Sequence, residues 1–382
     1  MCTQLVHPNY VAPEGFSGVQ PGQFSASTVF FRSAQAYRER NWCSGEGYIY
    51  GSHGTPTTFA LESRISALEG VQYCLLYPSG LNAIAQVFLA LLKPGDELLV
   101  PINVYPAVRM LVLHELVPMG IGCRLYDPTN LESLLFARNT KLIWVEAACS
   151  ITFEFPDVEA IAARAKESGV VVGLDNTWGA GIALDAYGFG IDISVQALTK
   201  YPCGSADVIM GSVTTQDREL YTLLQMCRMR FGVSVSARDA SVVLSGMNTL
   251  RLRYEAHDSA TRKIVEWANH RREFHRVLHP TAPDAVGQNI WLQHCSAAAG
   301  LFSVVFKPEY NTGYVDKFID SLRLFRIGVS WGGPVSLVLS FDRNVASVTE
   351  LPGVLVRFCI GLEDVDDLIT DLEQALFTAS QQ

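Results

Sequence analysis

The chain of 382 residues lacks long hydrophobic runs, internal repeats and low-complexity tracts. No apolar run approaches the roughly 20 residues that a membrane-spanning helix needs. The opening segment, residues 1–4, has no basic stretch followed by an apolar one, which a cleaved leader would require. We therefore expect a soluble protein that keeps its N-terminus and has no membrane partner.

Paired cysteines and clustered basic charge are also missing. The nine cysteines form no CxxC pair, and this odd, scattered set favours reduced thiols in the cytoplasm. Lysine and arginine number 29 against 38 aspartates and glutamates, and they are spread along the chain. Because scattered cations under a net charge of −9 attract phosphate backbones weakly, we expect no nucleic-acid partner.

Three histidines lie close together in the sequence at positions 270, 275 and 279. No acidic or cysteine ligand accompanies them, and the segment has the pattern of a basic, solvated helix. We expect no metal site.

Apolar residues are abundant: they make up 49% of a chain longer than a usual single domain. In the middle of the chain, short apolar runs alternate with helical patterns, which is typical of a mostly parallel sheet covered by helices. The expected strands are 73–77, 97–101, 122–126, 141–146, 170–174 and 193–198, and the expected helices are 81–92, 104–116 and 157–168. Further strands are expected at 301–306, 337–340 and 355–360, before a final helix over about 365–377.

Polar groups follow two of these strands: Asp175 comes after 170–174, and Lys200 comes after 193–198. Ligands bind at the carboxyl ends of strands in open α/β sheets, so the two side chains mark a candidate site. A lysine amine forms an imine with a cofactor aldehyde, while an aspartate keeps a pyridine nitrogen protonated. Position alone also allows a capping role for Asp175 and a surface charge for Lys200.

A small-residue turn at Tyr77-Pro78-Ser79-Gly80-Leu81 leads from an expected strand into an expected helix. Free N–H groups and the helix dipole favour a phosphate at such a junction. An ordinary tight turn would use glycine in the same way.

Together these segments resemble the Cys/Met-metabolism family of pyridoxal-phosphate (PLP) enzymes, and most closely its bacterial cystathionine β-lyase branch. The resemblance runs through the segments 3–7, 26–29, 50–57, 77–80, 175–178, 196–201, 330–333 and 356–364. It implies an α/β protein of the aminotransferase-like fold type I, with a mostly parallel sheet in a large domain and a smaller C-terminal α+β domain. It also implies a homotetramer, a dimer of dimers with shared active sites.

The same resemblance suggests three parts of the chain. Residues 1–57 would form an N-terminal arm that contacts a partner subunit, helped by turn-rich segments such as 13–18. Residues 58–240 would form the large PLP-binding domain, and residues 241–382 the small C-terminal domain.

Cofactor-binding roles carry over to matching positions. Lys200 resembles the Schiff-base lysine, which also moves protons and must be neutral to attack. Asp175 resembles the partner of the pyridine nitrogen. Gly80, Leu81 and Thr199 match the phosphate cradle, the first two through backbone N–H groups and the third through its hydroxyl.

The remaining roles concern aromatic rings and the substrate. Tyr105 matches a ring that stacks on the cofactor and takes part in acid/base work, although a packed tyrosine would have the same pattern. Tyr50 matches a tyrosine that reaches the neighbouring subunit's cofactor phosphate. Arg357 resembles the arginine that binds the substrate carboxylate; a surface salt bridge is its alternative. Ser330 and Trp331 are expected beside the substrate, although a core tryptophan would look the same.

Several positions depart from the family pattern. Ser52 stands where an arginine usually binds the adjacent subunit's phosphate, and His53 could substitute for it only in part. The usual Glu-Ser-Pro is Glu146-Ala147-Ala148, and Val335 replaces a glutamate. The usual Gly-His-Ser-Asp is Gly204-Ser205-Ala206-Asp207. These changes leave Lys200 and Asp175 in place, but they put the substrate in question.

The resemblance favours β-elimination of L-cystathionine or a related sulfur amino acid, giving a thiol, pyruvate and ammonia. One alternative is γ-elimination or γ-replacement on a homoserine-derived or other γ-substituted amino acid. A second is a catalytically degraded PLP-binding regulatory or scaffold protein, which the changes at Ser52, Ala147 and Ala148 would fit.

Overall fold

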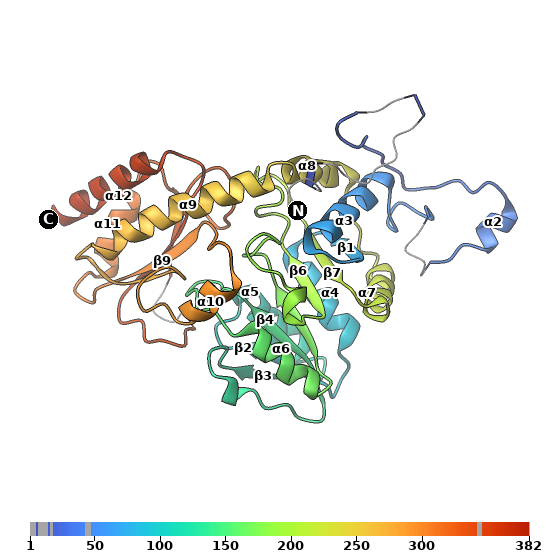
Figure 1. Ribbon diagram of the computed structural model, residues 1–382, viewed down its shortest axis with the longest axis horizontal. Coiled ribbons are helices and arrows are strands. Elements are labelled where there is room, and N and C mark those ends of the chain that lie inside the picture. Colours follow the sequence, from blue (N-terminus) through green and yellow to red (C-terminus); the bar gives the residue numbers. More distant parts are fainter. Residues whose placement is uncertain (1–4, 7–13, 16–17, 43–46, 342–345, 382) are drawn as a thin grey trace.

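A computed structural model describes residues 5–6, 14–15, 18–42, 47–341 and 346–381. Cys2, Cys43, and parts of the segments 3–7 and 13–18 lie outside the described residues. The chain forms a large α/β body, a smaller region with its own sheet at one side, and an extended N-terminal segment at the other (Figure 1).

The large body is built on a seven-stranded sheet with the order β1-β7-β6-β5-β4-β2-β3. Its strands are β1 (Tyr73–Tyr77), β2 (Glu97–Pro101), β3 (Gly122–Tyr126), β4 (Thr140–Glu146), β5 (Val171–Asp175), β6 (Ile193–Gln196) and β7 (Gly211–Thr215). The strands β2 to β6 run parallel, whereas β7 is antiparallel to both of its neighbours. The expected mostly parallel sheet is confirmed.

Helices cover both faces of this sheet: α3 (Pro56–Glu69), α4 (Gly80–Leu91), α5 (Pro106–Leu111), α6 (Val158–Glu167), α7 (Arg218–Arg230) and α8 (Ala237–Met247). Successive strand residues point to opposite faces, so one face packs Ile143 and Val145 against α3, α6 and α8. The other face packs Leu142 and Trp144 against α4, α5 and α7. The single helix expected over 104–116 is instead α5 followed by a π-helical turn, Val112–Leu116, closed by the bond from Val117 N to Val112 O.

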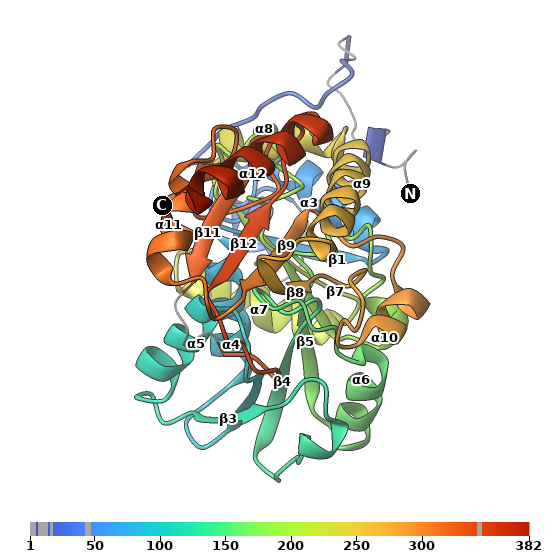
Figure 2. The same cartoon turned by 90° about the vertical axis from the view of Figure 1, so that its left-hand side faces the viewer.

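The small sheet has the order β10-β11-β12-β9-β8. Its strands are β8 (Phe274–Leu278), β9 (Leu301–Phe306), β10 (Arg326–Ile327), β11 (Leu337–Phe341) and β12 (Leu355–Cys359). Its outer face, with Phe302 and Phe358, packs under α9 (Leu250–Asn269), α11 (Thr312–Asp320) and α12 (Val365–Ser380) (Figure 2). The inner face, with Leu301 and Leu355, joins the core of the large body. A short helix, α10 (Gln288–His294), lies between β8 and β9 in the chain.

The prediction of a helix around the three histidines is wrong. Residues 274–278 form strand β8, and His279 directly after it is only 1% exposed. Burial lowers the pKa of His279 to about 3, and its Nδ1 lies 2.7 Å from Thr281 Oγ1. Within the described ranges, no three His, Cys, Asp or Glu side chains are grouped to hold a metal ion.

The proposed division of the chain stays a prediction. Helix α8 contacts α3 of the large body, whereas α9 contacts β8 and β9 of the small sheet. The expected boundary at residue 240 therefore lies inside α8. None of the helices in the described part of the chain is long and apolar enough to cross a bilayer.

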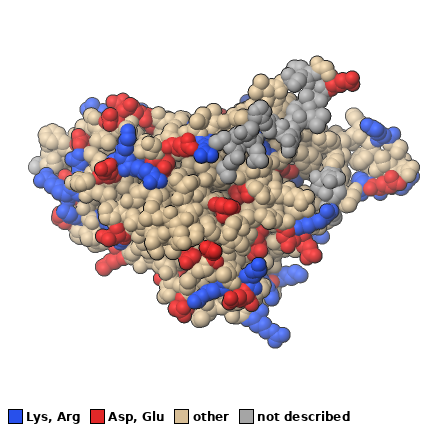
Figure 3. All heavy atoms as spheres, viewed as in Figure 1, with Lys and Arg blue, Asp and Glu red and all other residues tan. Residues whose placement is uncertain are grey.

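The N-terminal segment 18–42 projects from the body and carries the short helix α2 (Ala34–Arg38) far from both sheets (Figure 1). Large apolar side chains are exposed along it, including Val19 at 89% and Phe30 at 93%. On the face of the molecule shown in Figure 3, lysines and arginines lie among aspartates and glutamates.

Candidate active site

A cavity of about 700 Å³ lies between the carboxyl ends of the parallel strands, the start of α4 and the inner face of the small sheet. Nine of the ten predicted site residues line it: Gly80, Leu81, Tyr105, Asp175, Thr199, Lys200, Ser330, Trp331 and Arg357. The tenth, Tyr50, does not line this cavity. The fold therefore gathers residues that are up to 277 positions apart in the sequence, from Gly80 to Arg357.

Lys200 lies four residues beyond the end of β6, in a turn that places its amine inside the cavity. Its Nζ donates a hydrogen bond to Ser330 Oγ at 2.6 Å and lies 5.3 Å from the centre of the Trp331 ring. Burial lowers the pKa of Lys200 to about 8, and the Arg357 guanidinium acts in the same direction. At a given pH, a larger fraction of Lys200 than of an exposed lysine is therefore neutral. The neutral amine can act as a nucleophile or a base.

Asp175 is the last residue of β5 and pairs with Val195 of the neighbouring β6. The backbone N–H and the hydroxyl of Thr177 both donate to its Oδ1, at 3.0 and 2.5 Å. Burial raises the pKa of Asp175, while these two hydrogen bonds and the Lys200 charge oppose that shift. With Oδ1 held by Thr177, Oδ2 is available to a group bound in the cavity.

The start of α4 forms the anion-binding end of the cavity. Ser79 caps this helix by accepting a bond from Asn82 N at 3.0 Å. The N–H groups of Gly80 and Leu81 belong to the first turn, where a helix offers no internal partner. A Cβ atom on Gly80 would lie 2.7 Å from Ala197 Cβ, so this approach of two segments requires glycine.

The Thr199 hydroxyl bonds to both backbone groups of Met210, accepting from N at 3.0 Å and donating to O at 3.2 Å. This pairing holds the turn that carries Lys200 against the segment before β7. The hydroxyl can serve an anion only by turning its proton away from the Met210 carbonyl.

Tyr105 stands at the start of α5, and its backbone N–H donates to both carboxylate oxygens of Glu146, at 2.8 and 3.0 Å. Burial raises the pKa of the Tyr105 phenol, with a further contribution from Asp175. Burial, reinforced by Asp175, also raises the pKa of Glu146 well above its usual value. Glu146 lines the cavity and was not predicted as a site residue. Its position at the end of β4, directly opposite Asp175 in the ladder, is the signal that identifies it.

Arg357 lies on the inner face of β12, between Ser303 of β9 and Leu339 of β11. It is only 7% exposed, and its Nε has no hydrogen-bond partner among the described residues. A buried guanidinium that lines a cavity with an unused N–H is suited to bind a carboxylate, because its planar fork matches two oxygens.

The loop from Ser330 to Gly333 closes the cavity from the side of the small sheet. Ser330 has a φ of 123°, a conformation that side chains rarely adopt, and the Trp331 ring packs edge-on against Tyr201 at 5.4 Å. A Cβ atom on Gly332 would lie 3.0 Å from Tyr201 N, so the glycine lets this loop approach the lysine turn. The contact between Lys200 and Ser330 depends on this approach.

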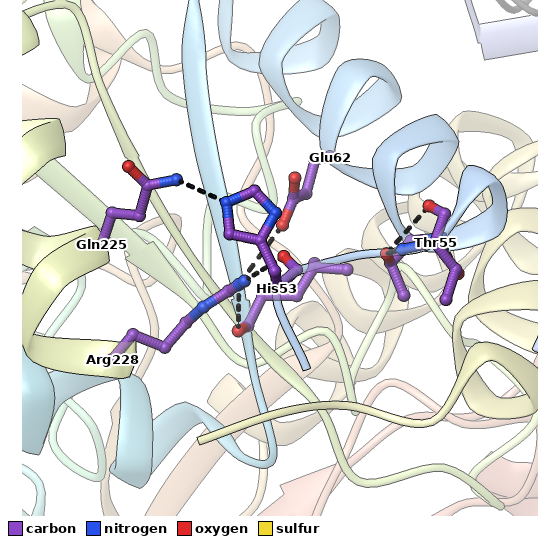
Figure 4. Close-up of polar contacts among 7 residues, drawn as sticks. His53, Thr55, Glu62, Gln225 and Arg228 are labelled. Atoms are coloured by element: carbon purple, nitrogen blue, oxygen red, sulfur yellow. Dashed lines mark hydrogen bonds and ion pairs between the residues drawn. The ribbon is translucent and has the colours of Figure 1, made fainter. Parts of the chain in front are cut away.

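Tyr50 is 47% exposed and forms an isolated antiparallel bridge with Thr28. Its expected contact is with a neighbouring subunit and stays a prediction. The segment after it is held by Arg228, which donates to His53 O at 2.8 Å and lies 3.4 Å from Glu62 (Figure 4). This buried ion pair fixes the base of the N-terminal segment to α7 and α3.

The family departures fall in different places. Ala148 and Ala206 line the cavity, and Ala147 is fully buried. Ser52 is exposed near Arg228, and Ser205 donates to Asp207 at 2.5 Å. Val335 is 49% exposed and lies outside the cavity lining.

The fold and the site define an α/β enzyme that binds a cofactor carrying an aldehyde, a ring nitrogen and a phosphate. Lys200, Asp175 and the first turn of α4 fit these three groups in one cavity, and the glycine at position 80 lets that turn lie against Ala197.

Comparison with known proteins agrees with this class. The chain belongs to the family of Cys/Met metabolism PLP-dependent enzymes, whose model matches residues 2–377. It is 38% identical over 386 residues to a putative cystathionine beta-lyase of Rhizobium johnstonii, covering 99% of this chain and 96% of the relative. It is 33% identical over 383 residues to the cystathionine beta-lyase of Escherichia coli, covering 97% and 96%.

A solved structure supports the same conclusion. The crystal structure of metB from Corynebacterium glutamicum matches with a TM-score of 0.90 at 28% identity, covering 98% of this chain and 97% of that one. The predicted family and fold class are confirmed, and pyridoxal 5′-phosphate is the cofactor.

Proposed function

We propose that this enzyme is a carbon–sulfur lyase that catalyses β-elimination of L-cystathionine or a related sulfur amino acid. The products would be a thiol, pyruvate and ammonia. The observation that carries the proposal is the placement of the Lys200 amine in one cavity with Asp175 and Arg357. The cystathionine beta-lyases among the relatives support the same reaction.

The cofactor would be held by residues at the ends of the strands. Lys200 would bind it covalently, Asp175 would face the ring nitrogen, and Tyr105 would cover the ring. The N–H groups of Gly80 and Leu81, with the Thr199 hydroxyl and Tyr50 of a neighbouring subunit, would hold the phosphate. When bound, PLP supplies the electron sink for the carbanion at the substrate Cα.

The other side chains handle the substrate. Arg357 binds the α-carboxylate, and Ser330 and Trp331 border the amino acid on the side of the small sheet. The Lys200 amine takes the Cα proton, because its lowered pKa keeps a neutral fraction available. The Tyr105 phenol, whose raised pKa keeps it protonated, is placed to give a proton to the leaving sulfur.

We propose a homotetramer with shared active sites. The exposed apolar residues of the projecting segment 18–42, including Phe30 at 93%, support burial against a second subunit. A cytoplasmic location stays a prediction from cysteine usage, and the seven cysteines in the described part of the chain are all unpaired.

The test is to incubate the purified PLP-loaded enzyme with L-cystathionine and to measure pyruvate and 2-oxobutyrate. We expect pyruvate, lost in Lys200→Ala and kept in Lys141→Ala, which changes an exposed lysine. A predominance of 2-oxobutyrate would replace the proposal with γ-elimination. No keto acid from cystathionine or any S-substituted cysteine, with the bound cofactor still coloured, would favour a PLP-binding protein without this activity.

A further inference from the structure

The wall of the cavity around Arg357 is apolar. On the inner face of the small sheet, Arg357 is paired in register with Leu339 on one side and with Ser303 on the other. Phe341 and Leu301 line the cavity on the same face, and the Arg357 guanidinium carbon lies 5.4 Å from the centre of the Phe341 ring. The carboxylate site is therefore a single cation with apolar side chains, Leu339, Phe341 and Leu301, on most of its sides and the Ser303 hydroxyl on one.

The loop after β4 continues this apolar wall. Ile151 and Phe153 line the cavity and are buried, at 7% and 3% exposure. The Ser303 hydroxyl donates to Ile151 O at 2.8 Å, which ties this loop to the small sheet beside Arg357. At the cavity edge, Ile209 and Val329 are 70% and 83% exposed, so the apolar lining extends to the surface.

Charged groups in the cavity are few and already have partners or assigned roles. The only cations among its described lining residues are Lys200 and Arg357. Lys200 is needed for the cofactor, and Arg357 can neutralise one carboxylate. The lining residues include three carboxylates: Glu146 accepts from the Tyr105 backbone, Asp175 accepts from Thr177, and Asp207, at the exposed edge, accepts from the Ser205 hydroxyl.

A substrate with a second charged amino-acid group is a poor match for this lining. L-Cystathionine carries a carboxylate and an ammonium at each end, and the described lining residues offer no further cation to its second carboxylate, which would instead lie near the Asp207 carboxylate at the edge. An unpaired charge placed against hydrocarbon costs free energy, whereas an apolar substituent gains free energy by burial.

We propose that the preferred substrates are L-cysteine conjugates whose sulfur carries an uncharged, apolar group. This inference rests on the β-elimination proposed above. In that reaction the Cα proton passes to Lys200, the Cβ–S bond breaks, and its electron pair leaves with sulfur, which takes a proton to become an apolar thiol. One water then completes the balance, giving pyruvate and ammonium without an oxidant or reductant.

The experiment compares kcat/KM for pyruvate release by the PLP-loaded enzyme with four substrates: S-propyl-, S-benzyl- and S-carboxymethyl-L-cysteine, and L-cystathionine. The propyl and carboxymethyl groups are similar in size and differ in charge. We expect the two apolar substrates to exceed both charged ones by about 10-fold or more. Equal or higher kcat/KM for cystathionine would overturn this inference and leave the β-lyase proposal intact. Pyruvate from none of the four would overturn the β-lyase proposal itself.

A pair of variants tests the placement of the sulfur substituent. Val329→Arg adds a cation at the exposed cavity edge and should raise kcat/KM for S-carboxymethyl-L-cysteine relative to S-propyl-L-cysteine. Val335→Arg adds the same charge six positions away, outside the cavity lining, and should leave the ratio at its parental value. The same ratio in both variants would overturn the placement of the sulfur substituent at the Val329 edge of the cavity.

Discussion

The Lys200 amine donates a hydrogen bond of 2.6 Å to the hydroxyl of Ser330. Lys200 follows the large sheet, whereas Ser330 lies in the loop between β10 and β11 of the small sheet. The bond therefore connects the large-sheet side of the cavity to the small-sheet side, through the Lys200 Nζ atom that is proposed to take the substrate proton. A change in the packing of the small sheet is expected to reach Lys200 through this loop.

The lowered pKa of Lys200, about 8, predicts that its amine titrates in an accessible range. In the cofactor-free protein, acylation of Lys200 should fall about tenfold per pH unit below that pKa, since the reactive neutral form is lost. Because Arg357 helps to lower this pKa, Arg357→Met should move the midpoint upward. The midpoint is measured by competitive acylation at a series of pH values, with mass spectrometry as the readout and Lys93 as the internal reference. A midpoint near 10.5 would contradict the prediction.

Replacing the Arg357 guanidinium by an amine should weaken substrate binding and leave cofactor binding unchanged. Arg357→Lys keeps the charge but loses the planar pair of donors, so KM for the amino acid should rise by about 10-fold or more. The affinity for PLP, followed by its absorbance, should stay at the parental value. A parental KM would show that Arg357 does not bind the substrate carboxylate.

Gly80→Ala should weaken the phosphate end of the site. The added methyl group would lie 2.7 Å from Ala197 Cβ, so the first turn of α4 must shift away from its position. We expect PLP to dissociate about 10-fold more readily, because the N–H groups that face the phosphate move. Gly313→Ala in α11 is the matched control, since its nearest neighbour would be 3.4 Å away. Equal PLP affinity in both variants would show that Gly80 does not help to bind the cofactor phosphate.

Glu62 predicts a pH-dependent stability at the base of the N-terminal segment. Burial raises its pKa from 4.5 to about 7 despite the nearby Arg228. Between these values the folded state binds more protons at Glu62 than the unfolded state does, so its contribution to stability falls as pH rises from 4.5 to 7. Glu62→Gln removes this titration. The melting temperature of the variant relative to the parent should therefore rise across that window, and a constant difference would contradict the assignment.

The strands of the large body were predictable because each is a short apolar run that ends in a polar or turn residue. The runs at 73–77, 97–101 and 122–126 match β1, β2 and β3 residue for residue. Strand β7 gave no such signal, since three of its five residues are Ser212, Thr214 and Thr215. Its hydroxyls are satisfied inside the sheet, as where Thr215 Oγ1 donates to Asp192 O, and such long-range partners leave no local pattern.

In the segment that contains the three histidines, the sequence predicted the wrong type of element. A basic composition predicted an exposed helix. In the structure, Val277 of β8 is buried in the core under the small sheet and Leu278 in the core of the large body, and His279 directly after them is buried as well. The segment pairs with β9, opposite Phe306 and the residues before it, and this pairing satisfies the backbone groups that a helix would satisfy internally.

The sequence by itself determined the cofactor end of this protein. Asp175 ends strand β5, Lys200 follows the neighbouring parallel strand β6, and Gly80 begins a helix after β1, so simple sheet geometry brings all three to one edge. Only the tertiary structure decided the substrate end. The position of Arg357 opposite Lys200, and the apolar residues around it, depend on how the small sheet packs on the large body. That packing arises from contacts far apart in the chain, which no local spacing of residues records.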